Sequence, residues 1–193
     1  MNIFYLDPDP SKCARMHNDK HTVKMILEYT QLLSTAHRLL DGKQSVVTIN
    51  NRKRKRWTLD DPSMNTKLFL ASHINHPCAI WARQSEDQYL WLYQLLTHLC
   101  KEYTHRYGKT HAVVGRCWDD LRNPPKSLKG IKGFTQPPQA MPEEFKVKGD
   151  SVTAYKNYYI GAKHRMAKWT NRNIPDWWCI NTVPTKEVQD AIL

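Results

Sequence analysis

Apolar residues recur with helical spacing through residues 17–40, a stretch that contains neither glycine nor proline. At about 100° per residue they cover both sides of a helix: Val23, Ile26, Leu27 and Leu33 on one, and Met25, Tyr29, Leu32, Ala36 and Leu39 on the other. The pattern therefore predicts a buried helix of about six turns, around which the rest of the chain is arranged.

One narrow polar row remains on this helix, at alternating spacings of four and three residues. Ionisable groups in such a row cost several kcal/mol to bury without partners. They must either pair internally, as Lys24 and Glu28 can at i,i+4, or face a wet cleft. A solvated helix face is usually wider than this row, so the pattern favours a cleft with Glu28 as the candidate active-site carboxylate. The row consists of His17, His21, Lys24, Glu28, Gln31, Thr35 and Arg38.

The other apolar patterns also predict helices, so the expected fold is all-α. A strong helix is expected from Ser85 to just before Gly108, and further helical pieces at 111–121 and 151–169. At 193 residues, the chain is expected to form one compact helical domain, 1–193, around the central buried helix.

Pro77 fits the first turn of another helix. Asn75 and His76 would then lie at its N-terminal end, where backbone N–H groups point outward and can meet a phosphate or a base edge. Both residues are therefore candidate DNA contacts.

Two long loops are expected within this domain. The basic loop, 43–65, contains five successive basic residues with no acid among them: Arg52, Lys53, Arg54, Lys55 and Arg56. Such a run repels itself, stays at the surface and can grip a phosphate backbone, although the same charges also suit a merely soluble loop. The second loop, 122–150, is rich in Pro, Gly and Lys and connects two parts of one core.

The overall charge favours a polyanionic partner. The net charge is +11, from 29 Lys and Arg against 18 Asp and Glu, and the chain contains seven Trp and nine Tyr. Basic groups neutralise phosphates while aromatic faces stack on bases, as Tyr158 can do from a helix rich in lysine. No stretch approaches the ~20 apolar residues of a membrane span, and the start lacks the features of a signal peptide, so a cytoplasmic protein is expected.

Cysteine and histidine spacing gives little support for a metal site. The five cysteines are scattered without a CxxC pair, which indicates reduced thiols. His17, Asp19 and His21 could ligate a metal, with help from His73 and His76. However, His17 and His21 lack the intervening glutamate of an HExxH motif. No metal or other cofactor is therefore expected, and a metal-dependent nuclease stays an alternative.

Two segments together resemble bacterial proteins grouped with the pyrimidine-dimer DNA glycosylases of endonuclease V type. VKMILEYTQLL, with Lys24, Glu28 and Gln31, is similar to that family's KQRVEALQIL-like helix. Residues 73–81, with Asn75-His76-Pro77, resemble its RNHPAVRMW-like segment, and MNIF resembles its short N-terminal run. The resemblance covers about 60 positions of the N-terminal half, and YKNYYIGAK is faintly similar to the family's C-terminal end.

The resemblance implies a largely helical protein that binds DNA, flips out a nucleotide and cleaves its glycosidic bond with an N-terminal amine and a helix glutamate. Glu28 matches that glutamate. A bulky Asn2 tends to leave Met1 in place, which would put the free amine on Met1 rather than on a trimmed second residue. Base removal by water activated at Glu28 does not depend on this amine, whereas an imine and strand nicking do.

The sequence thus predicts a monomeric DNA glycosylase, associated with the nucleoid, that acts on a damaged or modified pyrimidine in double-stranded DNA. A nucleic-acid-binding protein without catalysis is the main alternative, and the prediction covers both repair and action on modified foreign DNA. The remaining candidate DNA contacts are His17, Lys20, His21, Lys24, Gln31 and Arg38.

Overall fold

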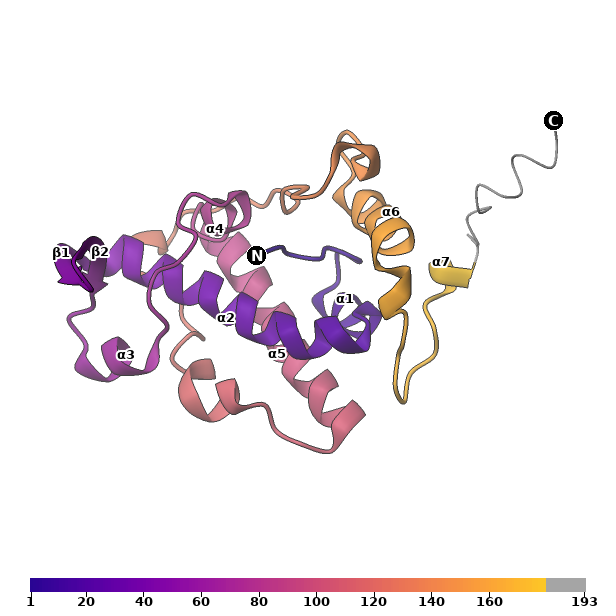
Figure 1. Ribbon diagram of the computed structural model, residues 1–193, viewed down its shortest axis with the longest axis horizontal. Helices are drawn as coiled ribbons and strands as arrows, with labels where there is room; N and C mark the ends of the chain where they lie inside the picture. Colours follow the sequence, from indigo (N-terminus) through magenta and orange to yellow (C-terminus); the bar gives the residue numbers. More distant parts are fainter. Residues whose placement is uncertain (180–193) are drawn as a thin grey trace.

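A computed structural model describes residues 1–179 as a mostly helical protein with one small sheet (Figure 1). The elements are α1 (Pro10–Met16), α2 (Asp19–Asp41), β1 (Lys43–Ile49), β2 (Arg52–Thr58), α3 (Pro62–Lys67), α4 (Pro77–Trp81), α5 (Glu86–Tyr107), α6 (Ser151–Lys163) and α7 (Asp176–Cys179). The expected domain 1–193 also includes residues 180–193, which lie outside the described part of the chain.

Helices α2 and α5 pack against each other across the middle of the molecule (Figure 1). Asn18 caps α2, since its Oδ1 accepts a hydrogen bond from the His21 N–H at 2.9 Å, and this cap separates α2 from α1. Ser85 caps α5, and Gly108 ends it with a φ of 63°, a left-handed conformation that glycine adopts without strain. The predicted bounds of α5 and the start of α4 at Pro77 are confirmed.

The exposure of α2 differs from the prediction of an almost entirely apolar, buried helix. In its first half, Val23 is 43% and Leu27 is 39% exposed, so this half presents an open face to solvent. The second half is covered because the chain returns over it between residues 57 and 72, where Arg38 and Thr35 bond to it. Helical periodicity identified the helix but not which of its apolar residues would be covered.

The prediction of a basic loop at 43–65 is wrong for most of its length, and with it the prediction of an all-α fold. β1 and β2 form an antiparallel hairpin in which Ile49 pairs with Arg52. Asn50 and Asn51 have φ of 50° and 59°, as the two-residue turns of such hairpins require. The β-branched run in β1 favours a strand, and the neighbouring basic side chains are solvated rather than buried.

The 122–150 segment contains only the short 3₁₀ turns Lys126–Leu128 and Glu143–Phe145. It is nevertheless held in place by hydrogen bonds. The Asp41 carboxylate accepts from the backbone N–H groups of Lys126 at 2.7 Å and Ser127 at 3.1 Å. The described helices of residues 1–179 include none with the length and apolar character needed to cross a membrane.

Candidate active site beside the N-terminus and helix α2

The N-terminal segment is part of the core, which fixes the position of the α-amino group. Ile3, Phe4, Tyr5 and Leu6 are all buried. The backbone N–H of Phe4 donates to the Tyr29 hydroxyl at 3.2 Å, and the Asn2 side-chain amide donates to the carbonyl of Ala140 at 2.8 Å. In Figure 1 the N-terminus lies beside α2 and α4. Asn2 therefore acts as an anchor that positions Met1.

Glu28 and the α-amino group lie around the same histidine. Burial lowers the pKa of His76; the positive α-amino group and His73 lower it further, while Glu28 raises it. Burial raises the pKa of the neighbouring Cys78 thiol, and the amine and Glu28 act on it with opposite signs. The carboxylate and the amine predicted to be catalytic thus both act electrostatically on the start of α4.

Glu28 also forms an ion pair with Lys24, with Nζ and Oε1 3.2 Å apart. The Glu28 side chain is only 16% exposed, whereas that of Lys24 is 68% exposed. A pair with one partner in solvent contributes about 1 kcal/mol or less, so a ligand phosphate can draw the ammonium away. Cavities of about 930, 770 and 510 Å³ lie elsewhere, and Glu28 lines none of these three. The cleft expected in front of Glu28 is not among them.

His76 caps α4, since its Nδ1 accepts a hydrogen bond from the Cys78 N–H at 3.1 Å. An accepting Nδ1 is unprotonated, so the neutral ring carries its proton on Nε2 and can donate from there. Asn75, directly before it, is exposed. Lys20 and Lys24 are exposed on α2, and Gln31 is partly exposed. These predicted DNA contacts are accessible from solvent.

The two histidines at the start of the polar row are structural. His17 is fully buried, its Nδ1 2.8 Å from the Cys13 carbonyl and its Nε2 2.8 Å from the Tyr29 hydroxyl, so no ring nitrogen is left for DNA. His21 is also buried, stacks on Phe4 with ring centroids 4.2 Å apart, and places Nδ1 2.5 Å from the Tyr159 hydroxyl. The prediction that both contact DNA is wrong because the core uses them.

Arg38 is likewise structural rather than a DNA contact. Its side chain is buried and makes five hydrogen bonds. The acceptors are the carbonyls of Trp57 at 2.8 Å, Asn65 at 2.9 Å, Leu68 at 2.9 Å and Phe69 at 2.6 Å, and Asn65 Oδ1 at 2.9 Å. All five donors of the guanidinium are used, so Arg38 joins α2 to the chain that follows the hairpin.

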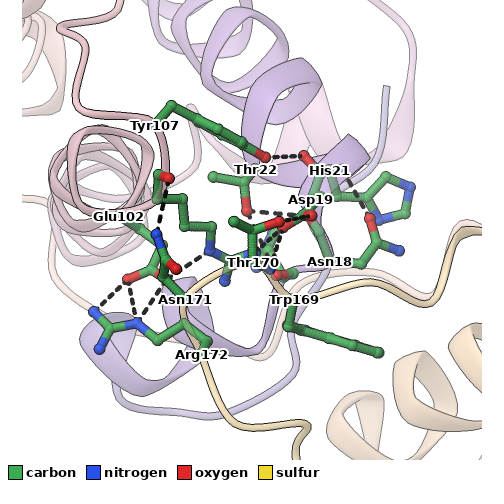
Figure 2. A network of polar contacts seen from close by, with 12 residues as sticks. Asn18, Asp19, His21, Thr22, Glu102, Tyr107, Trp169, Thr170, Asn171 and Arg172 are labelled. Atoms are coloured by element: carbon green, nitrogen blue, oxygen red, sulfur yellow. Dashed lines mark hydrogen bonds and ion pairs between the residues drawn. The ribbon is translucent and has the colours of Figure 1, made fainter.

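The alternative metal site at His17, Asp19 and His21 is also overturned. Asp19 Oδ1 accepts from Arg106 Nη1 at 3.0 Å and from the Thr170 N–H at 2.9 Å, and its Oδ2 accepts from the Thr170 hydroxyl at 2.7 Å (Figure 2). Both ring nitrogens of His17 and both carboxylate oxygens of Asp19 are occupied by protein partners, so His21 alone cannot form the predicted site. Across residues 1–179, no three His, Cys, Asp or Glu side chains are grouped to hold a metal ion.

Tyr158 lies within an aromatic cluster beside the N-terminal segment. Its ring is nearly parallel to that of Phe4 at 6.3 Å and lies 5.3 Å from that of Phe145. The ammonium of Lys163, which the sequence did not single out as a contact, lies 4.7 Å from the centre of the Tyr158 ring. Lys163 also contributes to lowering the pKa of His21, so a cation stands near this edge of the site.

The buried histidines make the stability depend on pH. Burial lowers the pKa of His17 to about 4, of His21 to about 3 and of His37 to about 4, against 6.5 for an exposed ring. Below pH 6.5 the unfolded chain therefore binds protons that the folded chain does not. We expect the free energy of unfolding to fall between pH 6.5 and 4 by up to about 1.4 kcal/mol per pH unit for each histidine. Urea unfolding at pH 7, 6 and 5 measures this slope.

Two variants separate these groups from other titrations. His37→Gln leaves a polar group near the Tyr89 hydroxyl, which lies 2.8 Å from His37 Nε2, but cannot be protonated in this range, so it should reduce the slope. His105→Gln, at an exposed position, should leave it unchanged. Equal slopes in all three proteins would contradict the assignment.

These features define a basic, mostly helical protein with a buried N-terminal segment that bonds to α2, the helix that carries Glu28. The family model described as pyrimidine dimer DNA glycosylase matches residues 1–114, which include the N-terminal segment, Glu28 and His76. The chain belongs to the pyrimidine dimer DNA glycosylase family. Comparison with curated proteins gives no match, and comparison with solved structures gives none either. The family name implies a DNA glycosylase, and hence a protein that binds DNA.

Proposed function

We propose that this protein excises a damaged or modified pyrimidine base from double-stranded DNA, with Glu28 as the catalytic carboxylate. The observation that carries the proposal is the match of residues 1–114 to the glycosylase family, because this range contains the buried N-terminal segment and Glu28, whose side chain is only 16% exposed. The target nucleotide leaves the helix first, at a cost of a few kcal/mol that is lowest for a damaged or weakly stacked base.

Glu28 would act when the bond between the sugar C1′ and the base nitrogen breaks. The bonding electrons leave with the base, and positive charge develops at C1′, which a nearby carboxylate stabilises. Glu28 also orients a water molecule, whose oxygen forms the new bond to C1′ while the carboxylate accepts its proton. That proton can pass to the departing base, so the carboxylate is restored.

A second route uses the N-terminal amine as the nucleophile. Its nitrogen forms a bond to C1′ as the bond from C1′ to the base breaks, and the nitrogen then gives up a proton. The bond from C1′ to the sugar ring oxygen breaks next, that oxygen takes up a proton, and the ring-opened product is an imine. β-Elimination from the imine then breaks the bond to the 3′ phosphate and nicks the strand. Met1 supplies the amine if it is retained, and Asn2 supplies it if Met1 is removed.

The surface around Glu28 suits DNA. Lys20 and Lys24 are exposed on the same side of α2, and neutralising phosphates with lysines provides most of the affinity for a duplex. Gln31 on α2, and Asn75 and His76 at the start of α4, offer hydrogen-bonding groups. Tyr158, with Lys163 over its ring, lies beside Phe4 of the N-terminal segment. We propose that a monomer binds in this way, in the cytoplasm with the nucleoid.

The test is to incubate the protein with duplexes that each carry one defined pyrimidine lesion, and to identify released bases by mass spectrometry. We expect release of a lesion base and no release from undamaged DNA. Borohydride in parallel reactions traps an imine as a stable adduct on the N-terminal peptide. Base release without an adduct would assign the reaction to water activated by Glu28. Absence of base release from every lesion would contradict the proposal.

A non-catalytic DNA-binding protein is the second candidate function. The Lys24–Glu28 ion pair favours it, because a carboxylate held by a lysine can serve only to order α2. This alternative requires steep salt dependence of binding, no released base and tolerance of substitutions at Glu28.

A further inference from the structure

The β1–β2 hairpin is a basic ribbon that is open on both faces. Residues 52–55 of β2 are exposed, and no acidic residue occurs between Lys43 and Thr58. The described ion pair of the hairpin joins Lys43 Nζ to Asp60 Oδ1 at 2.9 Å, outside the run of five basic residues. A two-stranded hairpin without a covering layer is marginally stable by itself, so its charge and its exposure suit a partner of opposite charge.

The base of this hairpin is nevertheless firmly attached to α2. Arg38 Nη1 donates to the Trp57 carbonyl at 2.8 Å, from the last turn of the helix. Gly42 allows the two elements to approach, since a Cβ at this position would lie 2.4 Å from the Arg38 carbonyl oxygen and 3.2 Å from the Trp57 Cβ. The ribbon therefore has a defined place at the end of α2 (Figure 1).

A groove lies between the hairpin and the segment that leads to the candidate active site. It has a volume of about 280 Å³ and is lined by residues 53–57 of the hairpin and residues 71–74. The chain then continues directly into Asn75 and His76. Three residues span at most about 10 Å, so His73 in the groove lies within that distance of His76. Along α2, the 14 residues from Glu28 to Gly42 span about 21 Å.

We propose that this hairpin is a DNA arm that holds the duplex on one side of the flipped nucleotide. The distances of about 10 Å from the groove to His76 and about 21 Å from Glu28 to Gly42 correspond to about three to six nucleotides at 3.4 Å each. The major groove of DNA admits a two-stranded ribbon. Arg52 and Arg54 lie on one face of β2 and Lys53 and Lys55 on the other, so the two faces can meet the phosphates on either side of a groove. The arm rests on the proposed function in that it takes duplex DNA as its ligand.

The first test compares three double variants that each remove two positive charges. R52Q/R54Q and K53Q/K55Q neutralise the two faces of the arm, and K101Q/K109Q neutralises two exposed lysines in the region of the C-terminal end of α5. Binding to a lesion-containing duplex is measured as a function of salt, and thermal unfolding verifies that each variant is folded.

Each arm variant should reduce the slope of log K against log salt by about 1.8, or 0.9 per phosphate contact, with no change for K101Q/K109Q. A loss in one arm variant alone supports the arm and identifies its face. If neither variant binds more weakly than the control, the arm is overturned.

The second test locates the arm along the DNA. The duplex is shortened on one side of the lesion or on the other, to two base pairs. The wild-type protein should lose affinity when one particular side is shortened, and the arm variants should bind that shortened duplex as well as the wild type does. If the arm variants are weaker than the wild type on both shortened duplexes, the proposed position is wrong.

These results are independent of catalysis. If base release is normal and the arm variants bind DNA as well as the control variant, the proposed arm is wrong and the proposed function stands. Conversely, if the arm variants bind DNA more weakly but no base is released by the wild type, the arm is supported and the glycosylase function is contradicted.

Discussion

Glu28→Gln is expected to reduce base release by about 10²–10³-fold, towards the background rate, while DNA affinity stays nearly unchanged. The substitution keeps the size of the side chain but removes the negative charge that would stabilise C1′ in the transition state. It also removes the base that would accept a proton from water. Single-turnover base release, measured beside a gel-shift assay on the same duplex, gives both quantities.

Lys24→Gln is the matched control, because it breaks the same ion pair and leaves the carboxylate in place. If Glu28 is catalytic, Lys24→Gln should retain base release and bind DNA somewhat more weakly at high salt. If the pair only orders α2, the two variants should have similar, small effects on both measurements. A fully active Glu28→Gln variant would remove this residue from the mechanism.

The largest loss of stability is expected for Glu102→Ala. Glu102 is buried and accepts from Arg106 Nε at 2.7 Å and from Arg172 Nη2 at 2.8 Å (Figure 2). Arg106 in turn bonds to Asp19 at the start of α2, so two acids and two arginines form one balanced network. Removing Glu102 leaves the buried Arg106 short of a partner, which typically costs about 3–5 kcal/mol. Chemical denaturation measures the difference.

Glu143→Ala provides the comparison for an exposed ion pair. Its carboxylate lies 2.7 Å from Lys146 Nζ, but the Glu143 side chain is 85% exposed. A pair of this kind contributes about 1 kcal/mol or less. Similar free energies of unfolding for the two variants would show that the buried Glu102 network contributes no more to stability than the exposed Glu143–Lys146 pair. The network matters for function because it fixes the beginning of the helix that carries Glu28.

Local signals in the sequence predicted most of the helices. Ser85 before an acidic first turn, Gly108 after the last one, and Pro77 in the first turn of α4 are each explained by groups within a few residues. The hairpin was not predicted, because a run of five basic residues favoured a solvated loop. Its signal was present in the β-branched run of β1 and in Asn50-Asn51, a pair that tolerates positive φ.

The sequence also indicates which segments form the candidate site, but not which of its polar residues are held inside the core. The resemblance pointed to the N-terminal segment, α2 and α4 together, and the buried N-terminal segment bonds to α2 through Phe4 and Tyr29. The catalytic roles of Glu28 and Met1 stay a prediction. The roles of His17 and Arg38 could not be predicted, since their partners are Tyr29, Asn65 and backbone carbonyls that only the tertiary fold brings near. Helical position alone does not distinguish a polar side chain in a cleft from one that is satisfied inside the core.

A glycosylase must not only bind a lesion but also remove the damaged base. The decisive measurement follows complex formation and base release in one reaction, with wild-type protein in excess over duplexes that each contain one defined pyrimidine lesion, a pyrimidine dimer among them. We predict that bound duplex is converted to duplex with a free or partly released base, and that the undamaged duplex is bound but unchanged. A stable complex from which no base is ever released would contradict the account and leave a DNA-binding protein without catalysis.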